Sequence, residues 1–272
     1  MLVLVLGLAA SARAEDLKPT DVSRWDGFPG PTVQPTLREG EAFVTIPISS
    51  GPWKESGQLS FWLAPVVAAK PDSLVVQGRF HRFEVPGAFV APAAKPAKIA
   101  KGSYVQFAVA ATPTMAVNIG RVKKIAKDGT LSIDYLVVDD LHTVEVPPSR
   151  VRPLDGTLAW GQPISFPIDG QRALGWYVAP GRDDQHVWAL NTGLAYELEG
   201  ATPLAIKEFS RGAKVLAVVR TTSVFRDGKD QPPRQYLEPA VIVGVRDGGL
   251  TYKIKSAKGE SMDRSVDLVF AR

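Results

Sequence analysis

The chain has 272 residues, of which 45% are hydrophobic and 22% charged, and it carries a formal net charge of +4 with a pI of about 9.2. This composition is that of a globular protein, and the basic excess is too small to identify a nucleic-acid partner. Because the sequence contains no cysteine, disulfides, thiolate zinc sites, iron–sulfur clusters and cysteine nucleophiles are excluded.

Residues 1–14 have the pattern of a secretory signal peptide. The apolar run LVLVLGLAA at 2–10 is followed by Ser11-Ala12-Arg13-Ala14 and then by charged residues, although no Lys or Arg precedes it. Such a run is too short for a permanent membrane span. We therefore expect cleavage after Ala14, no stable transmembrane segment afterwards, and a secreted or periplasmic protein of bacterial type. A buried N-terminal strand is the alternative.

Residues 15–40 contain four prolines and little apolar periodicity, which predicts a Pro-rich extended arm. From residue 41 onward the sequence repeats itself. The segment SLVVQGRFHRFEVPG at 73–87 aligns without gaps with HVWALNTGLAYELEG at 186–200, and three further matches keep the same order: 44–51 with 164–170, Gly102 with Gly212, and Asp128-Gly129 with Asp247-Gly248. The matches predict an internal duplication, with a first copy at 41–154 and a second at 155–272.

Each copy divides into two small units. Tryptophan occurs in the first half of each copy and is absent from 63–159 and 189–272. Apolar residues alternate with polar or small ones at 117–122, 131–136, 241–245 and 250–254, as in half-buried strands, and no segment forms a convincing amphipathic helix. The sequence therefore predicts an all-β fold with little helix, built from small barrel-like units in an A-B-A-B order. Residues 225–233, a polar insertion in the second copy, are expected to form an exposed loop.

The second unit of the first copy, residues 101–154, contains a glycine-started strand, an Asp-Gly hairpin and the closing segment VPPSRVRPL. Residues 211–270 follow the same pattern. It resembles the Tudor-like small β-barrels of the Src-homology-3-like class, which implies about five short strands in each unit. Tudor modules that read methylated side chains enclose a cation with several aromatic rings, whereas only Tyr104 and Tyr135 are candidates here. The resemblance therefore implies the barrel fold of these units and no particular ligand.

A basic segment is the clearest charge feature. No acidic residue lies between Glu84 and Asp128, and this interval holds seven basic residues: Lys95, Lys98, Lys101, Arg121, Lys123, Lys124 and Lys127. Together with Tyr104 and Tyr135, all of these except Lys95 form the predicted binding surface, and the expected ligand is an anionic polymer or a cell-envelope component. The alternative is that the lysines solvate a linker and protect a hairpin edge from aggregation.

Catalytic and metal-binding patterns are missing from the sequence. His142 and His186 follow acidic pairs, but no second histidine stands at metal spacing, which favours polar turn residues for both; His81 has no such neighbours. No nucleophile elbow, P-loop or dinucleotide fingerprint occurs. We predict no catalytic residues, no metal and no cofactor, and interpret the tryptophans as core.

These observations favour a non-catalytic secreted or periplasmic protein of tandem small β-barrels, which binds or scaffolds a partner. The partner is a protein or an anionic polymer. A hydrolase with its site between units remains the alternative from another class.

Overall fold

The computed structural model describes residues 40–47, 59–78, 82–93, 99–109, 115–168, 170–191, 194–226 and 229–272. Within these ranges every regular element is a β-strand or a three-residue 3-10 turn, which confirms the predicted all-β fold with little helix. The predicted signal peptide, the arm apart from Gly40, and the side chains of His81, Lys95 and Lys98 lie outside the described residues.

Twenty of the strands form four groups of five. Unit 1 consists of β1 (Glu41–Pro47), β2 (Leu59–Ala69), β3 (Ser73–Gln77), β4 (Arg82–Pro86) and β5 (Val90–Pro92). Unit 2 consists of β6 (Tyr104–Phe107), β8 (Asn118–Ile125), β9 (Leu131–Val137), β10 (Asp140–Val146) and β11 (Val151–Pro153). Unit 3 consists of β12 (Pro163–Ile168), β13 (Gln171–Pro180), β14 (His186–Asn191), β15 (Leu194–Glu199) and β16 (Thr202–Pro203). Unit 4 consists of β17 (Lys214–Arg226), β18 (Lys229–Arg246), β19 (Thr251–Ser256), β20 (Ser261–Ser265) and β21 (Val269–Ala271).

All four units share one antiparallel topology. Numbered within its own unit, each group has the strand order 4-3-2-1-5. The second strand is long enough to serve two halves of the sheet: in β2, residues 59–65 pair with β1 and residues 66–69 pair with β3. Each unit therefore folds over its own apolar side chains, although no hydrogen bonds close the sheet between its fourth and fifth strands in the described residues.

Equivalent turns recur at the positions that the repeat predicts. Gly102 and Gly212 both adopt left-handed φ values, 87° and 89°, just before the first strand of their units. Their N–H groups donate 2.8 Å hydrogen bonds to the carbonyls of Val122 and Ile242, which lie in the second strands. A side chain at either glycine would strain the turn, so these two positions require glycine for the same reason.

The matches around residues 73–87 and 186–200 extend to hydrogen bonding. The N–H groups of Gly87 and Gly200 donate to the carbonyls of Asp72 and Gln185, each of which immediately precedes the third strand of its unit. Their conformations differ, since Gly200 has a φ of 68° whereas Gly87 begins the 3-10 turn η2 (Gly87–Phe89). The units therefore share one topology, and the two copies share these turn positions.

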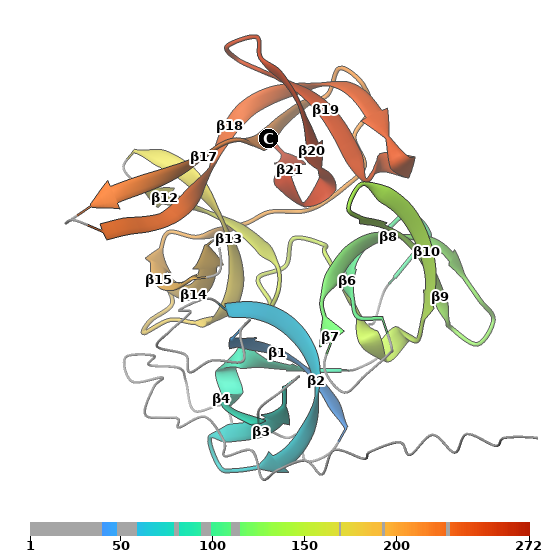
Figure 1. Ribbon diagram of the computed structural model, residues 1–272, viewed down its shortest axis with the longest axis vertical. Helices are drawn as coiled ribbons and strands as arrows, with labels where there is room; N and C mark the ends of the chain where they lie inside the picture. The colour runs from blue at the N-terminus through green and yellow to red at the C-terminus, as the bar shows by residue number, and fades with distance from the viewer. Residues whose placement is uncertain are drawn as a thin grey trace, which may run out of the picture.

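The units form a ring in the order 1-2-4-3, with unit 1 at the bottom of Figure 1 and unit 4 at the top. Units 1 and 2 are joined by pairing of β2 with β7 (Met115–Ala116), and units 3 and 4 by pairing of β13 with β18. In both cases the second strand of the first unit takes part: β2 pairs with the segment just before β8, and β13 pairs with the middle of β18, at Tyr236 and Leu237. Units 1 and 3 share an apolar core, in which Val178, Trp188 and Leu190 pack with unit 1.

The connection between the two copies is anchored at the same junction. Trp160 is buried, its indole Nε1 donates a 3.0 Å hydrogen bond to Thr45 Oγ1, and its ring meets Phe61 edge-on at 4.7 Å. Arg152 from β11 stacks over both Phe43 and Trp160 at 5.6 Å, and burial lowers the pKa of its guanidinium. These contacts fix unit 1 against unit 2 and against the connection.

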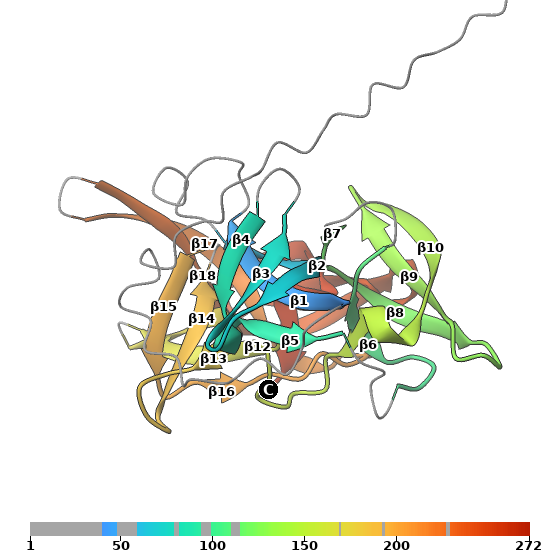
Figure 2. The ribbon, with the colours of Figure 1, turned by 90° about the horizontal axis from the view of Figure 1, so that it is seen from below.

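One expectation is wrong. In its described part the insertion at 225–233 is a paired hairpin and not a loop, because β17 and β18 remain paired as far as Arg226 opposite Lys229. The physical reason is that a continued hairpin satisfies backbone groups that a loop would leave to solvent. The resulting arm projects away from the ring in both ribbon views (Figures 1 and 2).

Candidate functional site

A pocket of about 280 Å³ lies where the four units meet. Its lining residues come from the second strand, or the segment just before it, in every unit: β2, the β7–β8 segment, β13 and β18. The first strand of unit 2 and the third strand of unit 3 complete it. Because no single unit encloses this space, the pocket exists only when the ring is assembled. We call it the junction pocket.

Apolar side chains form most of the junction pocket. Leu59 and Phe61 come from β2, Trp176 from β13, Leu190 from β14, and Ile119, with its neighbour Val117, from unit 2. Trp176 is only partly buried, and it also packs against the cores of units 1 and 4. Its ring is thus held by packing while part of its surface remains open, as in a preformed ligand site.

Three polar side chains complete the lining: Ser60, Gln106 and Gln235. Ser60 and Gln235 are partly buried, and neither side chain has a hydrogen-bond partner among the described residues. Gln106 is 2% exposed; its Nε2 donates a 2.7 Å hydrogen bond to the Gly161 carbonyl, while its Oε1 has no partner in the described structure. The described lining residues include no Asp, Glu, His, Lys or Arg.

The backbone at Gly161 positions Gln106. Gly161 has a φ of 78°, and a Cβ atom there would lie 2.2 Å from Gln106 Oε1, so only glycine allows this approach. The Gly161 N–H donates to the Tyr177 carbonyl at 2.8 Å, and the Tyr177 N–H donates to Gln162 at the same distance. Since Tyr177 adjoins Trp176, one chain of hydrogen bonds orients both an aromatic wall and an amide of the junction pocket.

The predicted basic surface is divided by the structure. Lys101, Lys124 and Lys127 are exposed and have no ion pair with a described residue. Lys123 lies 3.3 Å from Asp134 across the sheet, and Arg121 pairs with Glu208 of the loop before unit 4 at 2.5 Å and also donates to the Gly248 carbonyl. The charge of Lys123 is therefore balanced by Asp134, and that of Arg121 by Glu208.

The two predicted aromatic residues are not brought together as a cage. Tyr104 is 3% exposed, and its hydroxyl donates to the Gly249 carbonyl at 2.8 Å in the contact between units 2 and 4. Because unit 4 covers Tyr104, its side chain does not lie on the exposed surface that was predicted to bind a ligand. Tyr135 is half-buried and packs edge-on against Phe107 at 5.1 Å within unit 2, close to the exposed His142.

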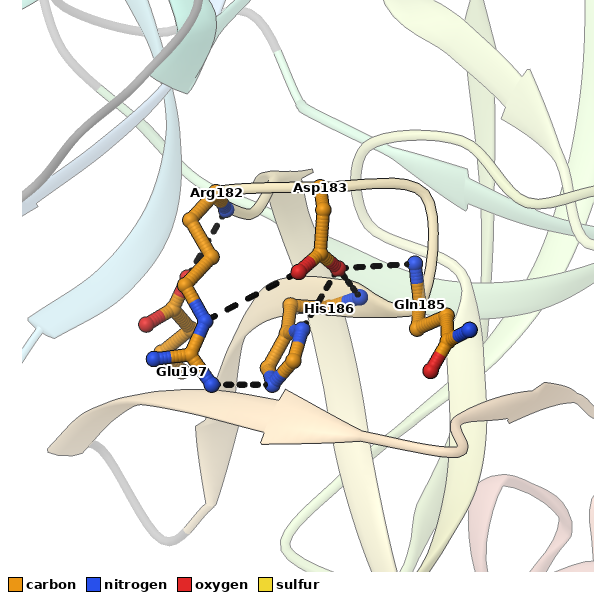
Figure 3. A network of polar contacts seen from close by, with 5 residues as sticks. All are labelled: Arg182, Asp183, Gln185, His186 and Glu197. Atoms are coloured by element: carbon orange, nitrogen blue, oxygen red, sulfur yellow. Dashed lines mark hydrogen bonds and ion pairs between the residues drawn. The ribbon is translucent and has the colours of Figure 1, made fainter.

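His186 belongs to a polar network in the loop between β13 and β14 (Figure 3). Its Nδ1 lies 2.5 Å from Asp183 Oδ1, and its Nε2 lies 2.6 Å from the Arg182 guanidinium. The hydrogen bond from His186 holds the pKa of Asp183 below its usual value, helped by the N–H groups of Gln185 and His186. The Arg182 N–H donates to Glu197 on β15 at 2.8 Å.

This arrangement closes a loop and does not present a general base. A guanidinium can only donate, so Nε2 of His186 acts as the acceptor and its lone pair is engaged. No cluster of three metal-ligating side chains occurs in the described part of the chain. His186 itself is the first residue of β14, directly after the turn to which the sequence interpretation assigned it.

Comparison with known proteins gives no matching family model and no curated relative of significant similarity. Within the described ranges, no helix has the length and apolar character needed to cross a lipid bilayer.

The sequence interpretation missed the junction pocket. Its residues lie between positions 59 and 235 and are contributed by strands that also fill ordinary cores, so periodicity marks them only as buried. The placement of tryptophan in the first unit of each copy was the single available signal, and it was interpreted as core. That is correct for Trp160 and Trp188, which are buried, and incomplete for Trp176.

Proposed function

We propose that this protein is a non-catalytic binding module that holds one small ligand in the junction pocket. The observation that carries the proposal is that all four units contribute to one preformed pocket with apolar walls and a few polar groups. Pockets of this character are the usual ligand sites of proteins, and the volume of this one, about 280 Å³, is slightly below their usual range of about 300–1,000 Å³. A ligand bound there would contact every unit and would stabilise the assembled ring.

The composition of the lining supports binding over hydrolysis. Ser60 supplies the one hydroxyl among the described lining residues, and no carboxylate or imidazole lines the pocket beside it. A serine nucleophile needs an adjacent base, and glycoside hydrolysis needs two carboxyl groups. His186, whose imidazole is already engaged by Asp183 and Arg182, is not among the pocket's lining residues.

We further propose that the units belong to the Tudor-like, Src-homology-3-like class of small barrels. The shared strand order supports this assignment. So do the 3-10 turns that precede the fifth strand in units 1, 2 and 4, namely η2, η3 (Pro148–Arg150) and η5 (Val266–Leu268). The same fold serves many ligands, so it does not select one.

Export to a periplasm or to the exterior is also proposed, on the strength of residues 2–14 alone. Mass spectrometry of the protein recovered from its native host should find Glu15 as the first residue. Soluble cytoplasmic protein that retains Met1 would refute export without affecting the pocket.

The binding proposal is tested by filling the pocket. Val117 lines it and is partly buried, so Val117→Trp should occupy the space with a large ring. Val67, which is 42% exposed on β2, provides the matched control Val67→Trp. We expect neutral fragments to perturb the NMR signals of Trp176 and Ile119 in the wild type and in Val67→Trp, and not in Val117→Trp. If no fragment binds the wild type at this position, the proposed function is wrong.

A second candidate function is favoured by three exposed lysines that have no carboxylate partner in the described part of the chain, Lys101, Lys124 and Lys127. They could hold an anionic polymer weakly against unit 2. This function uses a different surface and is tested separately below.

A further inference from the structure

We propose that the ligand of the junction pocket is a neutral molecule of about one ring, with a flat apolar body and a single group that both donates and accepts hydrogen bonds. A primary amide is the simplest such group. This inference rests on the proposed function and names the chemical class that the pocket selects.

Charge is excluded by the lining. No described lining residue is ionisable at neutral pH, so a bound carboxylate or ammonium group would lose hydration without gaining a counter-charge. On β8, the strand that carries Ile119, the two basic residues Arg121 and Lys123 pair with Glu208 and Asp134. A ligand charge would therefore lower the affinity.

A flat apolar body is favoured by the walls. Phe61 of unit 1 and Trp176 of unit 3 line the same small space together with aliphatic side chains of units 1, 2 and 3. Aromatic rings contribute large contact areas and pack against other rings in offset or edge-on arrangements. A volume of about 280 Å³ leaves room for a single-ring compound.

The polar group of the ligand is specified by Ser60 and Gln235. Both line the pocket, and neither side chain is hydrogen-bonded to a described residue. A carboxamide offers two N–H donors and one carbonyl acceptor, and a hydroxyl offers one donor and two lone pairs. A ligand that both donates and accepts can form hydrogen bonds with these two side chains. A hydrocarbon would displace water from them without replacing the hydrogen bonds.

Four matched probes test the inference on the full chain: benzamide, toluene, benzoate and benzylamine. Binding is measured by protein NMR titration at constant ionic strength. We expect benzamide to bind about 2- to 12-fold more tightly than toluene, the range that corresponds to one net hydrogen bond, and more tightly than either charged analogue. Equal affinity for toluene, or tighter binding of benzoate or benzylamine, would overturn the inference while leaving a ligand-binding pocket in place.

Variants locate the selectivity. Gln235→Leu should reduce the affinity for benzamide to that for toluene, and toluene binding should be unchanged. The control Gln185→Leu makes the same substitution on an exposed loop of unit 3 and should leave both affinities unaltered. Because Gln235 lies in a paired strand, Ser60→Ala provides a second, smaller change with the same expected direction.

The two proposals fail differently. If neutral fragments bind in the pocket but the four probes do not follow the expected order, or Gln235→Leu and Ser60→Ala leave the preference for benzamide intact, the chemical class is wrong and the binding module stands. If no fragment binds there, and Val117→Trp changes nothing, both proposals are wrong.

Discussion

Tyr104, the first residue of unit 2, donates a buried hydrogen bond of 2.8 Å to the carbonyl of Gly249 in unit 4, 145 positions further along the chain. Its hydroxyl also lies 3.3 Å from the hydroxyl of Tyr252, which accepts a 3.1 Å bond from the Phe209 N–H. Burial is the main reason that the pKa of Tyr104 is raised, so the phenol stays neutral. Together with the hydrogen bond from Arg121 to the Gly248 carbonyl, this contact joins the second and fourth units of the ring.

The first prediction concerns this contact. Tyr104→Phe removes the donor and leaves the Gly249 carbonyl buried without it, so we expect the free energy of unfolding to fall by about 1–3 kcal/mol. Tyr135→Phe is the matched control, because no described residue hydrogen-bonds to the Tyr135 hydroxyl and its loss should change stability by less than about 0.5 kcal/mol. Urea unfolding of both variants gives the comparison; equal effects would contradict the ring-closing role.

The second prediction separates backbone strain from steric contact at Gly161. Gly161 and Gly170 have similar left-handed φ values, 78° and 72°, but an added Cβ meets Gln106 only at Gly161 and open space at Gly170. Both alanine substitutions should cost about 1–2 kcal/mol for the left-handed conformation. Gly161→Ala should cost a further amount of about 1–3 kcal/mol, because Gln106 must move in a packed junction.

Thermal and urea unfolding measure this difference, and Gln106→Ala should remove most of it in the double variant. If Gly161→Ala and Gly170→Ala are equally destabilised, the contact with Gln106 does not constrain the turn.

The sequence predicted those features that depend on residues close together in the chain. Alternation of side chains gave the all-β class, and the turns at Gly102 and Gly212 were matched because a left-handed residue before a strand requires glycine in both copies. The alignment of 73–87 with 186–200 also places Glu84 at the position of Glu197. Glu84 forms an ion pair with Lys70 and accepts a hydrogen bond from Ser73, and Glu197 accepts one from the Arg182 N–H. In both units the fourth strand therefore binds the loop before the third strand.

Long-range partners could not be predicted in this way. Arg121 resembles a free basic residue in the sequence, yet its partner Glu208 lies 87 positions away in another unit. Tyr104 resembles an aromatic residue at the start of a half-exposed strand, and only the packing of unit 4 buries it. The junction pocket combines side chains from four units, so no single segment contains its pattern.

The third prediction is an alkaline loss of stability that depends on Tyr177. Burial raises the pKa of Tyr177 from 10.0 to about 12. Between these values the unfolded chain ionises first, so the contribution of Tyr177 to stability is complete below pH 10 and is lost as the pH rises toward 12.

Tyr177→Phe should therefore show a shallower decline of the unfolding free energy between pH 10 and 12 than the wild type. Between pH 7 and 9 the two proteins should have parallel stability curves, which is the internal control. Chemical denaturation at a series of pH values gives the slopes, and identical slopes above pH 10 would show that the phenol ionises freely in the folded state.

The last prediction tests three exposed lysines of unit 2. Lys101, Lys124 and Lys127 have no carboxylate partner among the described residues, so we expect weak retention on heparin at low ionic strength that decreases steeply with salt. Replacing all three by Gln should lower the dependence of log affinity on log salt by up to about 3, since each lost phosphate or sulfate contact removes about one counterion. Stability should change by less than about 0.5 kcal/mol at each site. The matched control replaces Lys253, Lys255 and Lys258, which are also exposed but lie on the β19–β20 hairpin of unit 4, outside the proposed surface of unit 2, and should matter less. If retention does not depend on salt, or if both triple variants reduce it equally, the lysines of unit 2 serve only to solvate its edges.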